Sequence, residues 1–409
     1  MSAASTHGHA PAVSKIDVPP FSGGGKWLAG GGGLGLVLLI LTFVGAATNP
    51  QVAYFSYLTA FTYWCGISIA SVMLLMMLHA THARWVTVLR RPLEAMAVST
   101  PLFLLLFIPV ILGMKYTHVW VDPPASLGRE ALRLIAGKAA YLNVKGFIVR
   151  GFLYLLLTCF LGQRLFGWSL RQDKGGDPIR LLQSQRNLSA GGLPFIALAI
   201  TFAAFDWLMS LNPTWFSTIF GVYYFGGSFV SALSLLAIGT AGGRAAGMFG
   251  GLMNDEHTHN VGKLMLAFVC FWTYIAFSQL LLIWIAGIPD ETPFYIRRFS
   301  AGWAPLGFLL ILGHFFIPFG ALLSRSLKRD PRKLRVVAYW ILFIHWVDVY
   351  WLVMPSLDTE RFTFHWTDVT AFLGVGLVSV AFTIWRLRGK PAVPVKDPYL
   401  AASIRYHQP

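Results

Sequence analysis

The stretches GGLPFIALAITFAAFDWLMSLNP (residues 191–213) and VVAYWILFIHWVDVYWLVMP (residues 336–355) decide the fold. Each is a run of about 20 mostly apolar residues, the length that an α-helix needs to cross the hydrocarbon core of a membrane. Each also holds one acidic residue, Asp206 or Asp348, seven positions before a proline. A carboxylate in hydrocarbon costs roughly 2.5–3.5 kcal/mol even on the most lenient insertion scale, so both aspartates are functional candidates.

Apolar runs of this kind recur along the whole chain of 409 residues. Hydrophobic residues make up 56% of the sequence and charged residues only 12%. The runs lack the alternation of apolar and polar residues that marks the strands of an outer-membrane barrel. We therefore predict an all-α integral membrane protein with about ten transmembrane helices. These helices span residues 27–47, 53–79, 94–114, 146–164, 190–210, 217–239, 263–287, 303–324, 336–354 and 368–386.

Lysine and arginine predict how these helices are oriented, because they concentrate in cytoplasmic loops. With the N-terminus in the cytoplasm, twenty-three of the 32 Lys and Arg residues fall on the cytoplasmic side and nine on the other. Both termini are therefore expected in the cytoplasm. The net charge of +15 then reflects membrane orientation, and nucleic-acid binding is not expected because no compact basic domain is present.

The two aspartates suggest an internal repeat. Asp206 and Asp348 each lie on the last helix of a group of four, at similar depth and in helices of the same direction. We expect two parallel four-helix bundles, made of helices 2–5 (residues 53–210) and helices 6–9 (residues 217–354), flanked by helices 1 and 10. Chance similarity is the alternative.

The parts outside this core are expected to be simple. Residues 26–390 form the membrane domain, between a disordered cytoplasmic tail of residues 1–25 and a second cytoplasmic tail of residues 391–409. In the longest outer loop, residues 129–141 have the pattern of a short surface helix.

Two histidines are predicted near the middle of the membrane, His314 on the eighth helix and His345 on the ninth. His345 and Asp348 are three positions apart and share a helix face. Histidine titrates near neutrality and can pass a proton in either direction. Three interpretations stay open, namely a proton relay, a hydrogen-bonded pair that fixes helix packing, and axial ligation of a haem b. Against haem, bis-histidine haems usually come in pairs that need four histidines on two helices, and His79 near the inner end of the second helix has nothing opposite it at matching depth.

Further polar residues extend a candidate proton path. At its inner end we expect His79 and Glu94, although stabilisation of a helix start explains Glu94 equally well. A stripe of hydroxyls runs along the sixth helix, and small residues there also serve close helix packing. The stripe consists of Tyr224, Ser228, Ser231 and Ser234.

Neither a metal site nor a catalytic residue is predicted. The three cysteines lie in apolar helices without CxxC spacing, so they cannot assemble a zinc site or an iron–sulfur cluster.

Three stretches resemble a known family. RPLE (residues 91–94), SLNPTWFSTIFGVYYF (residues 210–225) and HWVDVYWLVMP (residues 345–355) are similar to the smaller polysulfide-reductase-like (NrfD-type) membrane subunits of alternative complex III. The resemblance covers roughly residues 27–390, including the ten-helix layout.

This resemblance implies a subunit of a quinol:cytochrome c oxidoreductase, or of one with another electron acceptor, in a bacterial inner membrane. Such subunits bind no cofactor of their own and assist proton transfer. The implied partners are a larger NrfD-type membrane subunit, an iron–sulfur subunit and multihaem cytochromes. A quinone or quinol is a further candidate ligand, and Trp207, Tyr350 and Trp351 are candidates to line its site, although aromatic belts at the membrane surface explain them more simply.

A secondary transporter with two moving bundles is the rival interpretation, since transporters also contain repeats and buried acids. Two expectations weigh against it. The repeats are predicted to be parallel, and the helices are predicted to be unbroken.

Overall fold

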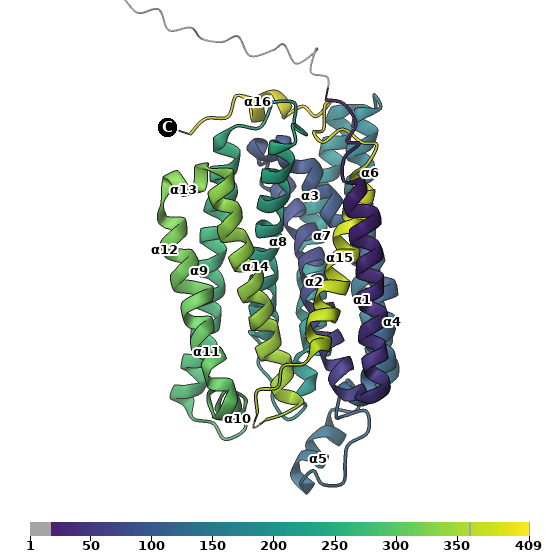
Figure 1. The fold of residues 1–409 in the computed structure, drawn as a ribbon, viewed down its shortest axis with the longest axis vertical. Coiled ribbons are helices and arrows are strands. Elements are labelled where there is room, and N and C mark those ends of the chain that lie inside the picture. The colour runs from purple at the N-terminus through teal and green to yellow at the C-terminus, as the bar shows by residue number, and fades with distance from the viewer. Residues whose placement is uncertain (1–17, 360, 409) are drawn as a thin grey trace, which may run out of the picture.

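The structure is a computed structural model that describes residues 18–359 and 361–408. Its helices run side by side along the long axis of the molecule (Figure 1). Within the described residues, ten helical segments are long and apolar enough to cross a membrane. The predicted all-α membrane fold of about ten spans is thus confirmed. No strand occurs in this part of the chain beyond one isolated bridge between Pro20 and Pro391.

Each span consists of one helix or of a few consecutive helical pieces. In chain order they are η2 (Trp27–Gly31) with α1 (Gly32–Thr48); α2 (Pro50–Ala80); η3 (Arg84–Leu89), α3 (Arg90–Ala97) and α4 (Thr100–Thr117); α6 (Val144–Asp173); α7 (Pro178–Trp207) with η4 (Met209–Leu211); α8 (Phe220–Ala245); α9 (Asp255–Ala286); α11 (Ala304–Leu310), η6 (Ile311–Phe316) and α12 (Ile317–Leu323); α14 (Pro331–Val353) with η7 (Met354–Ser356); and α15 (Trp366–Leu387). Short helices outside the spans are α5 (Arg129–Gly137), α10 (Pro293–Phe299), η5 (Ala301–Trp303), α13 (Arg325–Arg329) and α16 (Leu400–Ile404).

Several helices begin well before their apolar stretch, and the cause is local. Asn49, Asp177 and Asp330 each precede a proline and accept hydrogen bonds from backbone N–H groups of the first helical turn. Such caps, with proline in the first turn, favour a helix start whatever the hydropathy of that turn.

Two spans are interrupted, so the expectation of unbroken helices is wrong. The third span breaks between α3 and α4, where Pro101 has no N–H to donate and the Thr100 hydroxyl bonds the Ala97 carbonyl instead. The eighth span passes through the π-helical segment η6, just before Pro318. Proline and π-helical segments are common causes of such irregularities.

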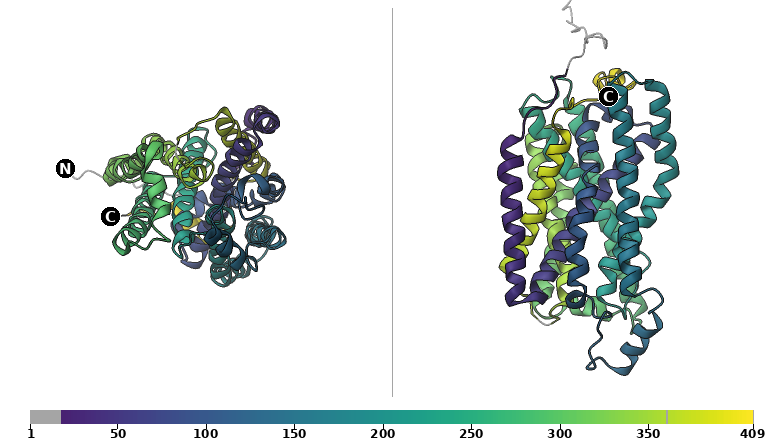
Figure 2. Two further views of the ribbon diagram at one scale, coloured as in Figure 1. Left: turned by 90° about the horizontal axis from the view of Figure 1, so that it is seen from below. Right: turned by 90° about the vertical axis from the view of Figure 1, so that its right-hand side faces the viewer.

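The spans that are predicted to form two bundles are described as two groups. One group is α2, α4, α6 and α7, and the other is α8, α9, α11–α12 and α14. The groups meet where α2 packs against α8 and α14 and where α7 packs against α8. Helices α1 and α15 pack against each other, and both contact α2, so they flank the first group on one side (Figure 2).

The two ends of the bundle differ. At one end, called the α5 end, the helix predicted within residues 129–141 projects beyond the spans, and it ends at Gly137 (Figure 1). At the other, the α16 end, residues predicted to form a tail are packed, since Val393 and Leu400 are fully buried. The tail predicted over residues 1–25 lies mostly outside the described residues.

Candidate functional site

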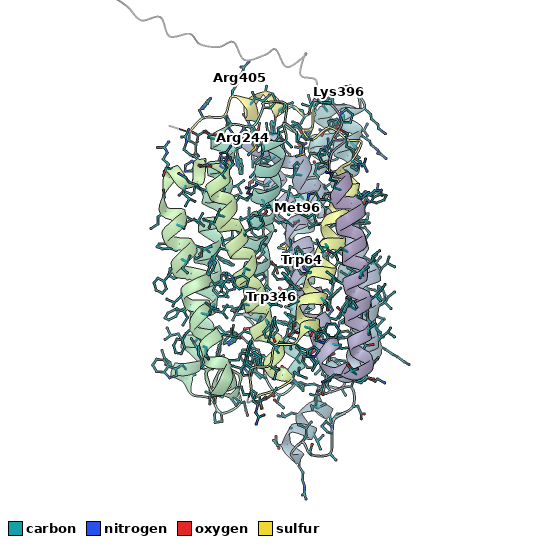
Figure 3. The ribbon with its side chains drawn as sticks, in the orientation of Figure 1. Trp64, Met96, Arg244, Trp346, Lys396 and Arg405 are labelled. Carbon is teal, nitrogen blue, oxygen red and sulfur yellow. The ribbon has the colours of Figure 1, made fainter. Side chains whose placement is uncertain are left out.

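Asp348 is fully buried on α14 and lies at the centre of a group of polar side chains. The hydroxyl of Tyr223 on α8 donates a hydrogen bond to its Oδ1. His345 Nδ1 lies 3.3 Å from its Oδ2, as the spacing of three residues on one helix face leads one to expect. Trp346, the residue after His345, is partly buried and lies about midway between the two ends of the bundle (Figure 3).

His314 joins this group from the π-helical segment η6. Its ring centroid lies 5.9 Å from that of His345, with the two rings nearly perpendicular. It also stacks on Trp272 of α9, with the ring centroids 3.7 Å apart. The sequence left open whether the two histidines meet, and the structure brings them together.

A glycine allows α8 to approach His345 closely. A Cβ atom built on Gly227 would lie 2.4 Å from Cε1 of the His345 ring. Tyr223, one helical turn earlier on α8, faces the same group. The face of α8 that carries Tyr223 and Gly227 therefore forms one wall around the histidine–aspartate pair.

Several polar atoms of this group have no hydrogen-bond partner among the described residues. They are both ring nitrogens of His314, both ring nitrogens of His345, and Asp348 Oδ2. The 3.3 Å approach between His345 and Asp348 is an ion-pair distance without hydrogen-bond alignment. Leaving a buried polar atom unsatisfied costs about 1–3 kcal/mol. The group is therefore suited to hold a cation.

The three side chains of this group could bind either a proton or a metal ion. His314, His345 and Asp348 offer atoms within 4.8 Å of one another, and no other such set occurs among the described residues. Tetrahedral zinc needs ligand atoms about 3.3 Å apart, as His345 and Asp348 are. A proton makes smaller demands on geometry. The sequence alone predicts no metal site here.

A buried arginine closes this region toward the α5 end. Arg298 on α10 is only 1% exposed and donates to the carbonyl oxygens of Trp351 and Leu352, at 3.1 and 2.7 Å. Burial lowers the pKa of Arg298 to about 9, although Tyr295 and Tyr223 act in the opposite direction. Arg298 is one of the nine Lys and Arg residues that the sequence places outside the cytoplasm. In the structure its side chain is buried against the last turn of α14.

Asp206 has different surroundings. Arg150 on α6 binds it through two nitrogens, each 2.9 Å from a carboxylate oxygen, and the Tyr154 hydroxyl donates to it at 2.8 Å. The Arg150 side chain is 22% exposed, whereas that of Asp206 is buried. A bidentate arginine fixes a carboxylate through two charge-assisted hydrogen bonds. The two aspartates match in the sequence but differ in their partners.

Tyr224 and Ser228, at the start of the hydroxyl stripe of α8, face α2 instead of Asp348. The Tyr224 hydroxyl donates to the Thr62 carbonyl at 2.6 Å, and a Cβ on Gly66 would lie 2.4 Å from Ser228 Oγ. Ser234 bonds its own helix at the Val230 carbonyl. Ser228 and Ser231 have no hydrogen-bond partner among the described residues. Close packing against α2 explains part of the stripe. The hydroxyls of Ser228 and Ser231 remain available for hydrogen bonds, for example to water.

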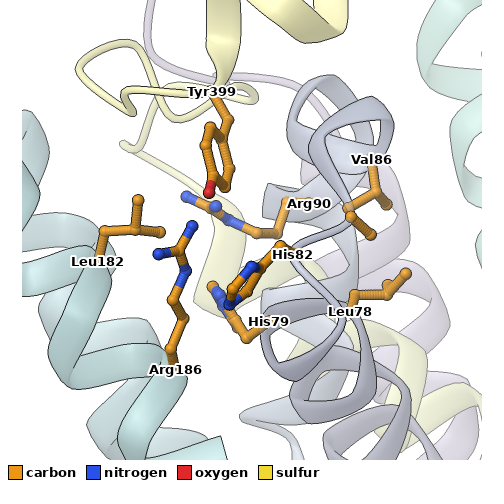
Figure 4. Close-up of a pocket in the computed structure, with 9 residues that line it drawn as sticks. Leu78, His79, His82, Val86, Arg90, Leu182, Arg186 and Tyr399 are labelled. Atoms are coloured by element: carbon orange, nitrogen blue, oxygen red, sulfur yellow. The ribbon is translucent and has the colours of Figure 1, made fainter.

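The predicted inner residues lie at the α16 end, in two settings. Glu94 is fully buried and paired with Arg90 and Arg91 at 3.0 and 2.8 Å. His79 lines a small pocket with Arg186 and Tyr399 (Figure 4). Its Nε2 has no hydrogen-bond partner in the described part of the chain. Glu94 is therefore fixed by two cations, whereas His79 offers a free nitrogen.

The three aromatic residues suggested for a quinone site do not come together. Trp207 is fully buried in the first bundle and packs on Phe61, with ring centroids 5.2 Å apart. Tyr350 donates to the Thr363 carbonyl at 2.6 Å, and Trp351 packs on Phe299 at 5.6 Å. Each is engaged in its own packing.

Sequence reasoning missed the partners that come from other helices. The sequence singled out Tyr224, whereas its neighbour Tyr223 contacts Asp348. Adjacent residues of a helix point about 100° apart, so the two tyrosines face different helices. Arg150 and Tyr154 carry no local signal that points to Asp206. Trp272 resembles any lipid-facing tryptophan in the sequence.

Comparison with known proteins adds no relative. No protein-family model matches the chain, and a search of curated proteins finds no match.

Proposed function

We propose that this chain is a cofactor-free membrane subunit of a quinol:cytochrome c oxidoreductase, or of a related quinol-oxidising complex, in a bacterial inner membrane. Both termini then lie in the cytoplasm, and the α16 end is the cytoplasmic end. The chain is not catalytic alone. It works with a larger NrfD-type membrane subunit, an iron–sulfur subunit and multihaem cytochromes. The resemblance of residues 91–94, 210–225 and 345–355 to smaller NrfD-type subunits supports this assignment.

The proposed task of the chain is proton transfer, with Asp348 as its central acid. The observation that carries it is the buried group of His314, His345 and Asp348, whose free nitrogen and oxygen atoms lie within 4.8 Å of one another. His345 Nδ1 lies 3.3 Å from Asp348 Oδ2, so a small rotation of the His345 ring would align the two atoms for proton transfer. Tyr223, bonded to the other carboxylate oxygen, orients the acid. Buried ionisable groups in membrane helices often form such relays.

The path has an inner and an outer part. Protons enter near His79, whose Nε2 is free, and cross by way of Ser228 and Ser231 toward His345. Glu94 and Asp206 are both held by arginines, so we assign them a supporting electrostatic role. A quinone site on this chain stays a secondary proposal, carried by the resemblance alone.

Purification from native membranes tests the assignment. A tag on the intact chain should recover a multihaem cytochrome and an iron–sulfur subunit, together with quinol oxidation activity. Recovery of the chain alone, in active form, would contradict it. Within the complex, Asp348→Asn should assemble normally and lose quinol oxidation or proton translocation.

A secondary transporter is the second candidate, and one observation favours it. The eighth span is interrupted by the π-helical segment that carries His314, and interrupted helices often mark transport sites. The breaks in the third and eighth spans do not occupy equivalent positions in the two bundles. Ion-driven uptake by the purified chain alone in vesicles would decide for the transporter.

A haem protein is the weaker alternative. His314 and His345 are neighbours, but Trp272 stacks on the first ring and α8 packs against the second at Gly227. A haem between them would have to displace both. A Soret band in the isolated chain would revive this alternative.

A further inference from the structure

A second polar feature lies away from the histidine–aspartate group, on the side of the molecule at the α16 end. An open cleft of about 660 Å³ runs between residues 163–170 of α6 and residues 385–390 at the end of α15. It is far larger than the small pocket beside His79, and it opens outward instead of being enclosed.

The mouth of this cleft is positively charged without compensation. Arg386, Arg388 and Lys390 line it, and no acidic residue does. Arg386 donates to the neutral Gln163 oxygen at 2.8 Å, and Lys390 donates to backbone carbonyls. None of the three forms an ion pair within the described residues. Burial, together with repulsion from Arg386 and Arg91, lowers the pKa of Lys390.

The inner wall of the cleft is apolar and aromatic. The ring of Phe166 lies under both Arg386 and Lys390, each 5.7 Å from its centroid. Trp385 is 54% exposed at the rim, the position that tryptophan favours at a membrane surface. On α6, Phe160 and Leu156 are half exposed and continue the helix face of Gln163 toward the middle of the membrane.

We propose that this cleft is a binding site for an anionic phospholipid. The phosphate lies between Arg386 and Arg388, and an acyl chain follows the exposed face of α6. Basic pockets between membrane helices bind acidic lipid head groups in this way. The apolar path leading from the cations distinguishes a lipid from a free phosphate ion, which would gain nothing from Phe160 or Leu156.

The test compares lipids on the intact purified chain. In native mass spectrometry, phosphatidylglycerol should bind more tightly than phosphatidylcholine with the same acyl chains. The double variant Arg386→Gln/Arg388→Gln should weaken phosphatidylglycerol binding by about fivefold for each charge removed. Binding of phosphatidylcholine should not change.

A neighbouring basic cleft supplies the control. Arg180 lines a cleft of about 590 Å³ near Asp177, so Arg180→Gln removes one positive charge at the same end of the molecule. This control should leave phosphatidylglycerol affinity within twofold. Arg388→Gln alone, at an exposed side chain, keeps the test valid if the double variant fails to fold.

Three results would overturn the proposal. The first is equal affinity for the two lipids, and the second is an equal loss in the Arg180→Gln control. The third is an Arg386-dependent thermal shift with inorganic phosphate and none with phosphatidylglycerol, which would assign the site to a free ion.

Discussion

At the scale of single residues, the two buried aspartates show how far the sequence leads. The closeness of His345 and Asp348 follows from their spacing on one helix, so it could be predicted. The pairing of Asp206 with Arg150 could not, because the two residues lie on different helices whose rotation no local pattern specifies. The same limit applies to Tyr223, which differs from the predicted Tyr224 by one step along the helix.

Gly227→Ala should disturb the histidine–aspartate group. The new Cβ would lie 2.4 Å from the His345 ring, so the ring or the helix must move, at a cost of about 1–3 kcal/mol. The midpoint of thermal unfolding in detergent should fall. Gly239, also on α8, has nothing within 4 Å of a built Cβ. Gly239→Ala should therefore raise the midpoint slightly, since alanine favours helix, and equal shifts in the two variants would contradict this account.

His118 should make the protein sensitive to mild acid. Its side chain is buried, and burial lowers its pKa from 6.5 to about 3. Below pH 6.5 the unfolded chain binds a proton at His118 that the folded chain excludes. The free energy of unfolding therefore includes the full contribution of neutral His118 above pH 6.5. This contribution declines as the pH falls toward about 3, by at most about 1.4 kcal/mol per pH unit.

The pH dependence of thermal unfolding checks this. Between pH 6.5 and 5, above the range of most carboxylates, His118→Gln should have a shallower decline in its unfolding midpoint than the unaltered protein. Parallel curves would show that His118 does not contribute.

At the scale of elements, hydropathy predicts where helices cross the membrane but not where they begin or break. The start of α7 lies twelve residues before the predicted apolar stretch, because Asp177 and Pro178 form a cap on a polar first turn. Apart from Gly313 and His314, the π-helical segment before Pro318 is made of apolar residues and looks like any other helix in the sequence. This segment positions His314, so an irregularity without a composition signal shapes the candidate site.

The C-terminal segment is an element that composition alone assigned to a tail. Asp397 is 4% exposed and accepts a hydrogen bond from Arg90 at 2.7 Å. Asp397→Asn should weaken this buried ion pair and destabilise the fold by about 3–5 kcal/mol, seen as a lower unfolding midpoint. Asp290→Asn, at an exposed position, is the matched control. If both variants unfold alike, the segment contributes little to stability.

At the scale of the whole molecule, the internal repeat expected from the aspartates stays a prediction. The groups are not functionally equivalent, however. One aspartate is neutralised by an arginine, and the other faces two histidines and a tyrosine. The central acid of the proposed proton path therefore lies in the second group, whereas its inner entrance at His79 lies on α2 of the first group.

The most direct test of the central claim is the number of protons moved per electron by the purified complex in vesicles. Asp348→Asn should assemble and retain its partner subunits. It should lose proton movement or, if the two are coupled, quinol oxidation as well. Asp122→Asn, at an exposed position, should behave as the unaltered complex. An Asp348→Asn complex with unchanged turnover and an unchanged proton-to-electron ratio would contradict the account.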